Sequence, residues 1–430
     1  MKDQIKKLRS YLLLWSTQSL SELGSAMTSY ALVLWLYNNS GSALKTALLT
    51  VCSYAPYVLM SIFAGALSDK WNKKRTMLVC DLFAAMTTVA AFVLIKTGTL
   101  QLWHLYTINA FNGLMNTVQQ PASEVASTQL IPEEYYQKTS GLRSFSRSLN
   151  SLLTPVLATV VFSFGGVSAV MAADLITFAG AFLTLLMFIS IPEPEGSKAK
   201  KEPVLSAARE GLRWLKGCPV VLKLIFFLAG INLIASAYNS ALPAMVLSKP
   251  SGGERVLGTV NFFAGAAALA GSLTASLTPA PKNRIRAICA ALFFSMSTEN
   301  FMLAFSDSPV IWCTGAVCGW LFIPYMGANL DVILRSTIPA DMQGRVYSCR
   351  NTLQFFTIPV GYLSGGLLID KVFEPYMAGI SRDSLLVSLF GSGKGSGAAF
   401  LFAVLGISGI AVCVIFSLLL RGEKERHEGL

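Results

Sequence analysis

The sequence has little charge and almost no histidine. Asp, Glu, Lys and Arg make up only 13% of the 430 residues, and apolar residues make up 53%. In an average soluble protein about a quarter of the residues are charged. A soluble fold cannot bury this much apolar surface, so we predict a membrane protein. Because only two His are present, neither a Ser/His/Asp catalytic arrangement nor a His-based metal site is expected.

Other common functional patterns are also missing. None of the eight Cys belongs to a CxxC pair, and most lie inside apolar runs, where Cys acts as a small buried side chain. No GxxxxGK(S/T) phosphate loop is present, so ATP is not expected as the energy source. The net charge of +11 comes from short basic groups between apolar runs, unlike the single basic face of a nucleic-acid-binding protein. We therefore predict no enzyme activity, no cofactor, no metal ion and no nucleic-acid partner.

Long apolar runs are abundant, and they predict the fold. Twelve of them reach about 20 residues, the length that crosses roughly 30 Å of hydrocarbon. They lie near residues 11–37, 44–67, 77–96, 102–129, 140–164, 167–191, 219–247, 257–279, 287–306, 310–337, 346–370 and 397–420. We predict an all-α polytopic membrane protein with two six-helix bundles, residues 1–191 and 219–430, joined by a cytoplasmic linker at 192–218.

The basic residues predict the orientation of these spans. With the N-terminus inside, most of the 34 Lys and Arg fall in cytoplasmic segments or at the span ends that face them, as the positive-inside rule requires. We therefore expect both termini to be cytoplasmic in a bacterial plasma membrane. Within the linker, the apolar residues of SAAREGLRWLKG recur at helical spacing. This segment is interpreted as a helix on the inner membrane surface or as a short solvated connector helix.

A short internal sequence repeat indicates that the two halves are related. IPEEYYQKTSGLRS (131–144) follows the fourth run, and IPADMQGRVYSCRN (338–351) follows the tenth. At an offset of 207 residues several positions match in type, including Pro132 with Pro339 and Arg143 with Arg350. Matching loops at matching depth are typical of a duplicated, pseudo-symmetric transporter with its site between the halves. A chance match of two short loops is the alternative.

The segment GALSDKWNKKRTM, residues 65–77, concentrates charge between the second and third runs. Such charge cannot sit in hydrocarbon, so we predict a short cytoplasmic turn. Asp69 is expected to hold one conformational state by pairing across the cytoplasmic face. For the Lys residues, simple membrane anchoring is the alternative. The candidate gating residues are Gly65, Asp69, Lys70, Lys73 and Lys74.

The order Gly-x-Leu-x-Asp-basic-x-x-basic-basic in this turn resembles the loop between helices two and three of the major facilitator superfamily. Softer strings resemble its drug-exporter branch, typified by macrolide-efflux proteins: QQPASEVASTQLIPEE (119–134), SRSLNSLLTPVLA (146–158) and AAREGLRWLKGCPV (207–220). The resemblance covers the whole chain. It implies a two-lobed, twelve-helix secondary transporter that works by alternating access with a central substrate site.

Three positions depart from the family pattern. Asn72 stands where the loop usually has Gly, and Asn tolerates a left-handed turn. Asn112 stands where many proton-coupled members carry an Arg in the fourth span. Thr154 precedes Pro155 where antiporters have a Gly-Pro pair. Proton antiport is therefore supported less directly than transport itself.

Ionisable side chains inside spans are the first candidates for coupling. Glu22, near the middle of the first run, can bind a cationic substrate, accept a proton, or do both in alternation; a carboxyl hydrogen-bonded to a neighbouring helix is the alternative. Asp174 and Glu299 lie toward the outer half of their spans. Arg147 is the most plausible buried base and can replace the missing Arg of the fourth span.

Uncharged polar residues within the spans are candidates for a substrate cavity. They are Gln18, Asn109, Asn112, Asn116, Asn232, Asn239 and Gln354. The three Asn of the fourth run recur at helical spacing and therefore share one face. Hydrogen bonds between helices are the alternative explanation.

Together these features predict a secondary active transporter in the lipid bilayer. We expect it to export an amphiphilic, cationic or neutral organic molecule, such as an antibiotic, by proton antiport as a functional monomer. The alternatives are an uncoupled or importing facilitator and a non-transporting membrane sensor.

Overall fold

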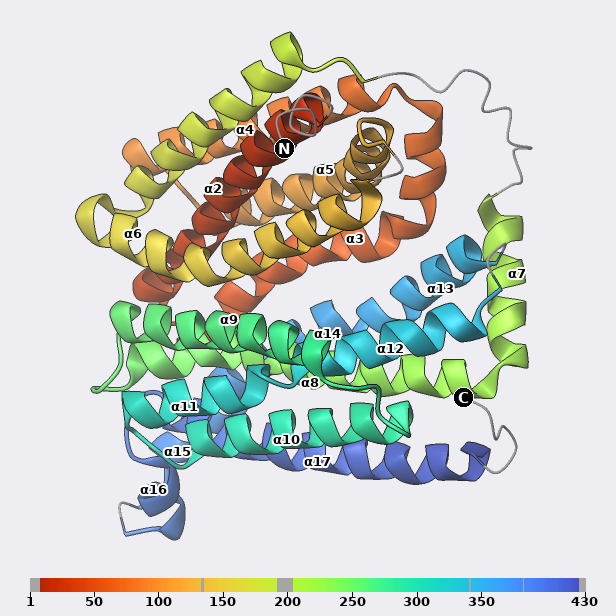
Figure 1. The fold of residues 1–430 in the computed structure, drawn as a ribbon. Coiled ribbons are helices and arrows are strands. Elements are labelled where there is room, and N and C mark those ends of the chain that lie inside the picture. Colours follow the sequence, from red (N-terminus) through yellow and green to blue (C-terminus); the bar gives the residue numbers. More distant parts are fainter. Residues whose placement is uncertain (1–7, 133–134, 192–203, 340–341, 382, 425–430) are drawn as a thin grey trace. The chain divides into compact units, whose positions relative to one another are not determined.

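A computed structural model describes residues 8–132, 135–191, 204–339, 342–381 and 383–424, and within them it shows helices joined by short turns and loops (Figure 1). The N-terminal helices are α2 Arg9–Ser40, α3 Ala43–Lys70, α4 Lys73–Lys96, α5 Leu102–Gln129 and α6 Tyr136–Phe188. The helices that follow are α7 Val204–Gly217, α8 Pro219–Ser248, α9 Glu254–Leu277, α10 Arg284–Ala304, α11 Pro309–Trp320, α12 Ile323–Thr337, α13 Gln343–Phe355, α14 Thr357–Leu367, the π-helix η2 Leu368–Phe373, α15 Glu374–Ala378, α16 Leu385–Phe390 and α17 Ser396–Lys424.

Each of the twelve predicted spans coincides with helix, so the predicted all-α multi-span fold is confirmed. Two predicted spans run together as α6, but Gly165 and Gly166 leave helical geometry, and Gly166 has φ 63°. A glycine adopts this left-handed backbone at little steric cost. Within the described residues, nine helical stretches are long and apolar enough to cross a membrane. α6 contributes one stretch to that number, and α2 and α5 contribute none because polar side chains interrupt them.

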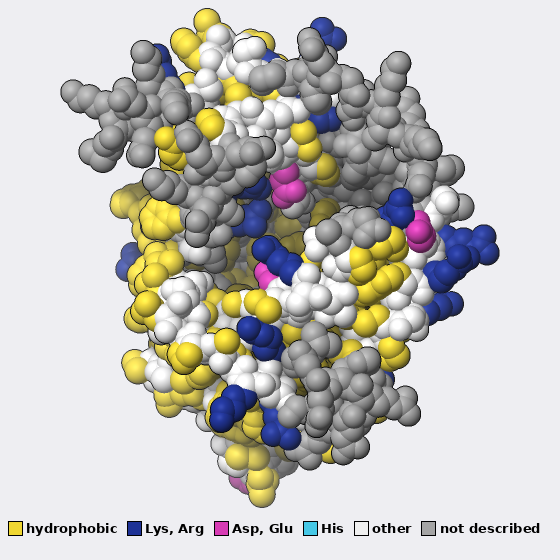
Figure 2. All heavy atoms as spheres, turned by 45° about the vertical axis from the view of Figure 1, so that its right-hand side comes forward, with side chains coloured by type: hydrophobic (Ala, Val, Ile, Leu, Met, Phe, Trp, Pro, Cys, Tyr) yellow, Lys and Arg dark blue, Asp and Glu magenta, His cyan; other side chains and the backbone are white. Residues whose placement is uncertain are grey.

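The chain forms two compact units. Unit 1 comprises Met1–Trp35 and Cys52–Ser206, and unit 2 comprises Leu36–Val51 and Ala207–Leu430. The helices α2 and α3 therefore contribute to both units, because the connection between them packs with the C-terminal helices. Many large apolar residues reach the surface; for example, Phe164 is 87% exposed and Ile176 is 74% exposed. Hydrophobic side chains also cover broad areas of the face in Figure 2. Such a surface suits contact with lipid.

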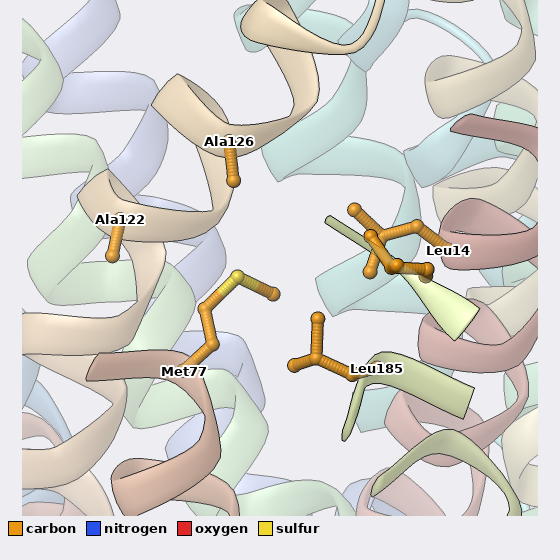
Figure 3. Packing of buried hydrophobic residues seen from close by; sticks show 6 residues of the cluster. Leu14, Met77, Ala122, Ala126 and Leu185 are labelled. Atoms are coloured by element: carbon orange, nitrogen blue, oxygen red, sulfur yellow. The ribbon is translucent and has the colours of Figure 1, made fainter. Parts of the chain in front are cut away.

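In unit 1, small side chains allow the helices to approach closely. Met77 of α4 and Leu185 of α6 are fully buried against Ala122 and Ala126 of α5 and Leu14 of α2 (Figure 3). Small residues at helix interfaces are typical of membrane proteins, because packing replaces the hydrophobic effect as the source of helix association.

In unit 2, α8 is the central helix and packs against α14 and α17. Gly361 and Gly365 of α14 form a GxxxG pair, and their backbones lie directly on Leu233 and Ala237 of α8. An added Cβ at Gly361 would meet the Leu233 carbonyl oxygen at 2.4 Å. This is the close helix approach that GxxxG sequences permit.

The connection between α2 and α3 is held by one carboxylate of the π-helix η2. Asp370 accepts hydrogen bonds from the backbone N–H of Ala43 (3.0 Å) and of Leu44 (3.0 Å) and from the Ser42 hydroxyl. It therefore caps the N-terminus of α3, where the free N–H groups and the helix dipole favour an anion. A π-helical turn reorients side chains relative to an α-helix, and here it presents Asp370 to α3.

We expect Asp370→Ala to lower the free energy of unfolding by about 1–2 kcal/mol, because it removes a charged cap from α3. Thermal unfolding of the purified protein in detergent measures this change. The exposed Asp383 in the same region provides the matched control, and Asp383→Ala should melt like the wild type. Equal melting of the two variants would show that the cap contributes nothing.

The linker ends in α7, which lies against the start of α13. The backbone of Gly211 approaches the Arg345 carbonyl so closely that an added Cβ would stand 2.7 Å from its oxygen. Leu215 is fully buried, the Cys349 thiol donates to the Ala208 carbonyl (3.3 Å), and Arg345 pairs with Glu210. Part of the apolar face of α7 is therefore covered by protein and not by a membrane surface.

Candidate functional site

The charged turn between α3 and α4 is only two residues long, Trp71 and Asn72. Asn72 has φ −60° and ψ 119°, and its side chain accepts from the Arg75 backbone N–H at 2.9 Å. The turn forms without the left-handed conformation that Asn would tolerate. Asn72 is instead the N-cap of α4, a position that Asn favours because its amide oxygen satisfies a free backbone donor.

Two basic residues at the start of α4 donate hydrogen bonds to nearby backbone carbonyls. The Lys74 ammonium donates to the carbonyls of Leu186 (3.0 Å) and Ile189 (2.7 Å) at the end of α6. Lys73 contacts the Trp71 carbonyl (3.2 Å) within its own turn. Lys74 thus fastens α4 to the C-terminal end of α6, where the helix dipole attracts a cation. The structure does not describe the side chains of residues 61–70. The predicted gating residues Gly65, Asp69 and Lys70 fall in this range.

We expect Lys74→Met to lower the free energy of unfolding by about 1 kcal/mol, because two terminal carbonyls of α6 lose a charged donor. Lys73→Met removes the same charge but leaves both bonds from Lys74 to the end of α6 in place, and it should have the smaller effect. Chemical or thermal unfolding of the two variants in the same detergent compares them. Equal losses would mean that Lys74 acts through its charge alone.

Glu22 lines a cavity of about 90 Å³ inside unit 1. Gln18, Ser19, Arg143 and Arg147 line the same cavity, so the structure brings together two predicted coupling residues, Glu22 and Arg147. Both side chains are exposed to open space, and Arg147 is therefore not the buried base that its position in the sequence indicates. A carboxylate beside basic side chains can take up or lose a proton, and it can form or break an ion pair with them, without any movement of the backbone.

Asp81, near the start of α4, connects three helices around this cavity. Gln18 of α2 donates to it at 3.4 Å, and Gln119 of α5 donates to it at 2.5 Å. Beside it, the Ser146 hydroxyl of α6 donates to Ser19 at 2.6 Å. These bonds fix the helices that carry Glu22 and Arg147.

Asp174 lies in a second polar cavity of unit 1, of about 110 Å³. Only 4% of Asp174 is exposed, and the Ser25 hydroxyl donates to its carboxylate at 3.0 Å. The predicted polar face of α5 reaches this cavity, because Asn109, Asn112 and Asn116 all line it. Asn112 also accepts from the Thr87 hydroxyl at 2.7 Å. The polar face of α5 therefore both lines a cavity and forms a hydrogen bond to a neighbouring helix.

Glu299 is enclosed within unit 2. Only 4% of it is exposed, the Tyr238 hydroxyl donates to it at 2.5 Å, and Trp320 hydrogen-bonds to its side chain. An added Cβ at Gly319 would stand 2.0 Å from its carboxylate oxygen. This close packing fits hydrogen bonding between neighbouring helices, and the role of Glu299 in coupling stays a prediction.

Of the other residues of unit 2 that were predicted to line a cavity, two form hydrogen bonds within the protein and one is exposed. Asn232 donates to the Gln354 carbonyl at 3.2 Å, and the Gln354 side chain accepts from Arg350 at 3.0 Å. The first bond joins α8 to α13 and fits the helix-to-helix interpretation, whereas the second lies within α13. Asn239 is exposed and stays a candidate for substrate contact.

Several residues of these cavities were not predicted from the sequence. They include Thr28, Ser53 and Thr88 around Asp174 and Ser123 and Ser127 around Glu22. Ser and Thr are common in membrane spans, where they bond to their own helix, so their sequence positions carry no signal.

A bundle of membrane spans with ionisable side chains in polar cavities is typical of membrane transporters. Residues 14–362 match the Major Facilitator Superfamily, and the chain therefore belongs to this superfamily of transporters. It is a multi-pass membrane protein that transports a small molecule, and it is not an enzyme.

Several distant relatives are named as exporters. The chain is 21% identical over 373 residues to macrolide efflux protein A of Streptococcus pyogenes, covering 85% of this chain and 90% of that protein. It is 24% identical over 383 residues to the multidrug efflux pump Tap of Mycolicibacterium fortuitum, covering 85% and 89%. Enterobactin exporter EntS of Salmonella paratyphi A is 24% identical over 291 residues, covering 66% of this chain and 67% of that protein.

Solved transporters share the fold over nearly the full length. A mutant of the nucleoside transporter NupG has a TM-score of 0.71 at 12% identity and covers 96% of this chain and 99% of its own. A bacterial homologue of the iron transporter ferroportin, in an inward-facing state, has a TM-score of 0.67 at 15% identity and covers 95% and 98%. At these identities the likeness establishes the fold alone.

Proposed function

We propose that the protein exports an amphiphilic small organic molecule from the bacterial cytoplasm in exchange for protons. The distant relatives named as macrolide and multidrug exporters support the direction and the substrate class. The observation that carries the proposal is the Glu22 cavity, in which an exposed carboxylate shares one enclosure with Arg143 and Arg147. Placing an ionisable group in a membrane span costs free energy, so such a group is a candidate for a functional role.

In this proposal Glu22 alternates between two states. The ionised carboxylate attracts the Arg147 guanidinium, and protonation of Glu22 removes this attraction. Arg147 then takes the place of the Arg that many proton-coupled members carry where this chain has Asn112. A proton that enters from outside and leaves inside thus changes the charge balance of the cavity during each transport cycle.

The proposal includes the conformational elements of the family. Asp69, with Gly65 and Lys70, acts as a gate at the cytoplasmic turn, and the two halves, 1–191 and 219–430, alternate access to a substrate bound between the spans. The linker 192–218 connects the halves, both termini are cytoplasmic, and the monomer is the functional unit.

An uncoupled or importing facilitator is the second candidate, because Asn112 bonds to Thr87 and offers no charge for proton coupling. Expression in a bacterium that lacks its main drug exporters separates the two. The antiporter should lower the steady-state accumulation of an amphiphilic cationic dye, and a protonophore should abolish the difference. A facilitator would only speed equilibration, with equal final dye levels. Equal final levels before protonophore is added would contradict the proposal.

A further inference from the structure

The second cavity of unit 1 contains a carboxyl group, and no basic side chain is among the described residues that line it. Among the described residues that line it, Asp174 is the one ionisable side chain, and the others are Ser, Thr, Asn and apolar residues. The cavity around Glu22 shares none of these residues. A carboxylate inside a span requires a counter-charge or a proton.

The polar groups around Asp174 are arranged as oxygen donors. Ser25 donates its hydroxyl hydrogen to the carboxylate, which leaves the lone pairs of its oxygen to the cavity. Asn109 uses its Nδ2 to bond the Leu105 carbonyl at 2.9 Å, which leaves its amide oxygen available. Hydroxyl, amide and carboxylate oxygens are the ligands that hard cations prefer.

Thr28 points independently to an occupant. It lines the cavity, only 7% of it is exposed, and its Oγ1 has no partner in hydrogen-bond geometry, although it lies near enough to interact with Asp174. Buried hydroxyls without a partner are rare in native proteins and require an explanation. A cation held between Asp174 and Thr28 would be bound by a carboxylate oxygen and by the Thr28 hydroxyl oxygen.

We propose that this cavity binds one sodium ion, held by the Asp174 carboxylate, the Ser25 and Thr28 hydroxyls and the Asn109 amide oxygen. One carboxylate balances a single positive charge, which disfavours a divalent ion. A proton alone would use the carboxylate but not the surrounding oxygens. The volume of about 110 Å³ accommodates an ion with several waters, since one water needs roughly 10–15 Å³ of such volume. Ser25, Ser29 and Asn116 are exposed and line a path for entry.

The test is thermal unfolding of the purified full-length protein without substrate, in detergent at constant ionic strength. Replacing choline chloride with sodium chloride should raise the melting temperature with a saturable dependence on concentration, and potassium chloride should not. Asp174→Asn should abolish the sodium effect. Thr28→Val, which keeps the shape, should raise the half-saturating sodium concentration by at least about tenfold.

Matched variants give the controls. The Thr184 hydroxyl of α6 donates to the Gly180 carbonyl of its own helix, away from this cavity. Thr184→Val should therefore keep the sodium response, as should Glu299→Gln. If Asp174→Asn does not fold, Thr28→Val decides. Stabilisation by sodium and potassium alike, by acid but not sodium, or by sodium in Asp174→Asn as well would overturn the proposal. Because no substrate is present, these outcomes are independent of whether the protein exports drugs.

Discussion

Replacing Gly113 with leucine should prevent unit 1 from packing and leave little stable protein. The backbone of α5 lies against α3 at this glycine, and an added Cβ would stand 2.0 Å from the Ser53 carbonyl oxygen and 2.8 Å from its carbon. A backbone obstacle cannot rotate away, so the two helices must separate. Overpacking of this kind costs about 3 kcal/mol or more. The cavity that Asn109 and Ser53 line would open with them.

Fluorescence-detected size-exclusion chromatography, followed by thermal unfolding, measures this loss. Gly180 of α6 provides the control, because nothing lies within 4 Å of the position of its added Cβ. Gly180→Leu should elute and melt like the wild type. If Gly113→Leu does the same, the close approach of α3 and α5 is incorrect.

Glu22→Gln should reduce gradient-driven transport in everted vesicles to the level of vesicles without the protein. The substitution keeps the size and hydrogen-bonding capacity of the side chain but removes its ability to change charge. The wild type should transport at a rate that depends on pH, and the variant should lose that dependence. Binding of substrate to the purified variant should remain, because the proposed role of Glu22 is coupling and not shape.

Glu210→Gln is the matched control, since Glu210 is an exposed carboxylate in α7 whose partner is Arg345. An exposed ion pair contributes little, so this variant should transport like the wild type. If Glu22→Gln transports as well as wild type with unchanged pH dependence, the coupling role is wrong.

The spans were predictable because a bilayer imposes one requirement along the chain. Each crossing needs an apolar run of sufficient length, and a break between two crossings needs residues that leave the helix. At Gly165 and Gly166 the predicted boundary between two spans coincides with the observed change in backbone geometry. The polar face formed by Asn109, Asn112 and Asn116 was predictable for the same reason, since helical spacing places the three residues together.

The partners of these residues were not predictable, because they depend on contacts between distant helices. Lys74 has the composition of a membrane anchor, yet it binds the carbonyls at the end of α6. Asp370 and Thr28 have no distinguishing pattern in the sequence, and only the packing of η2 and of α2 assigns them roles. Glu299 resembles Glu22 in sequence, but Tyr238 and Gly319 enclose it while Glu22 faces an open cavity.

Transport by the purified protein in proteoliposomes tests the central claim most directly. An imposed proton gradient should drive a cationic amphiphile against its concentration gradient, in the direction opposite to proton flow, and substrate gradients should in turn move protons. The account predicts both results for the wild type and neither for Glu22→Gln. Equilibration of the amphiphile without accumulation, whatever the gradient imposed, would contradict it.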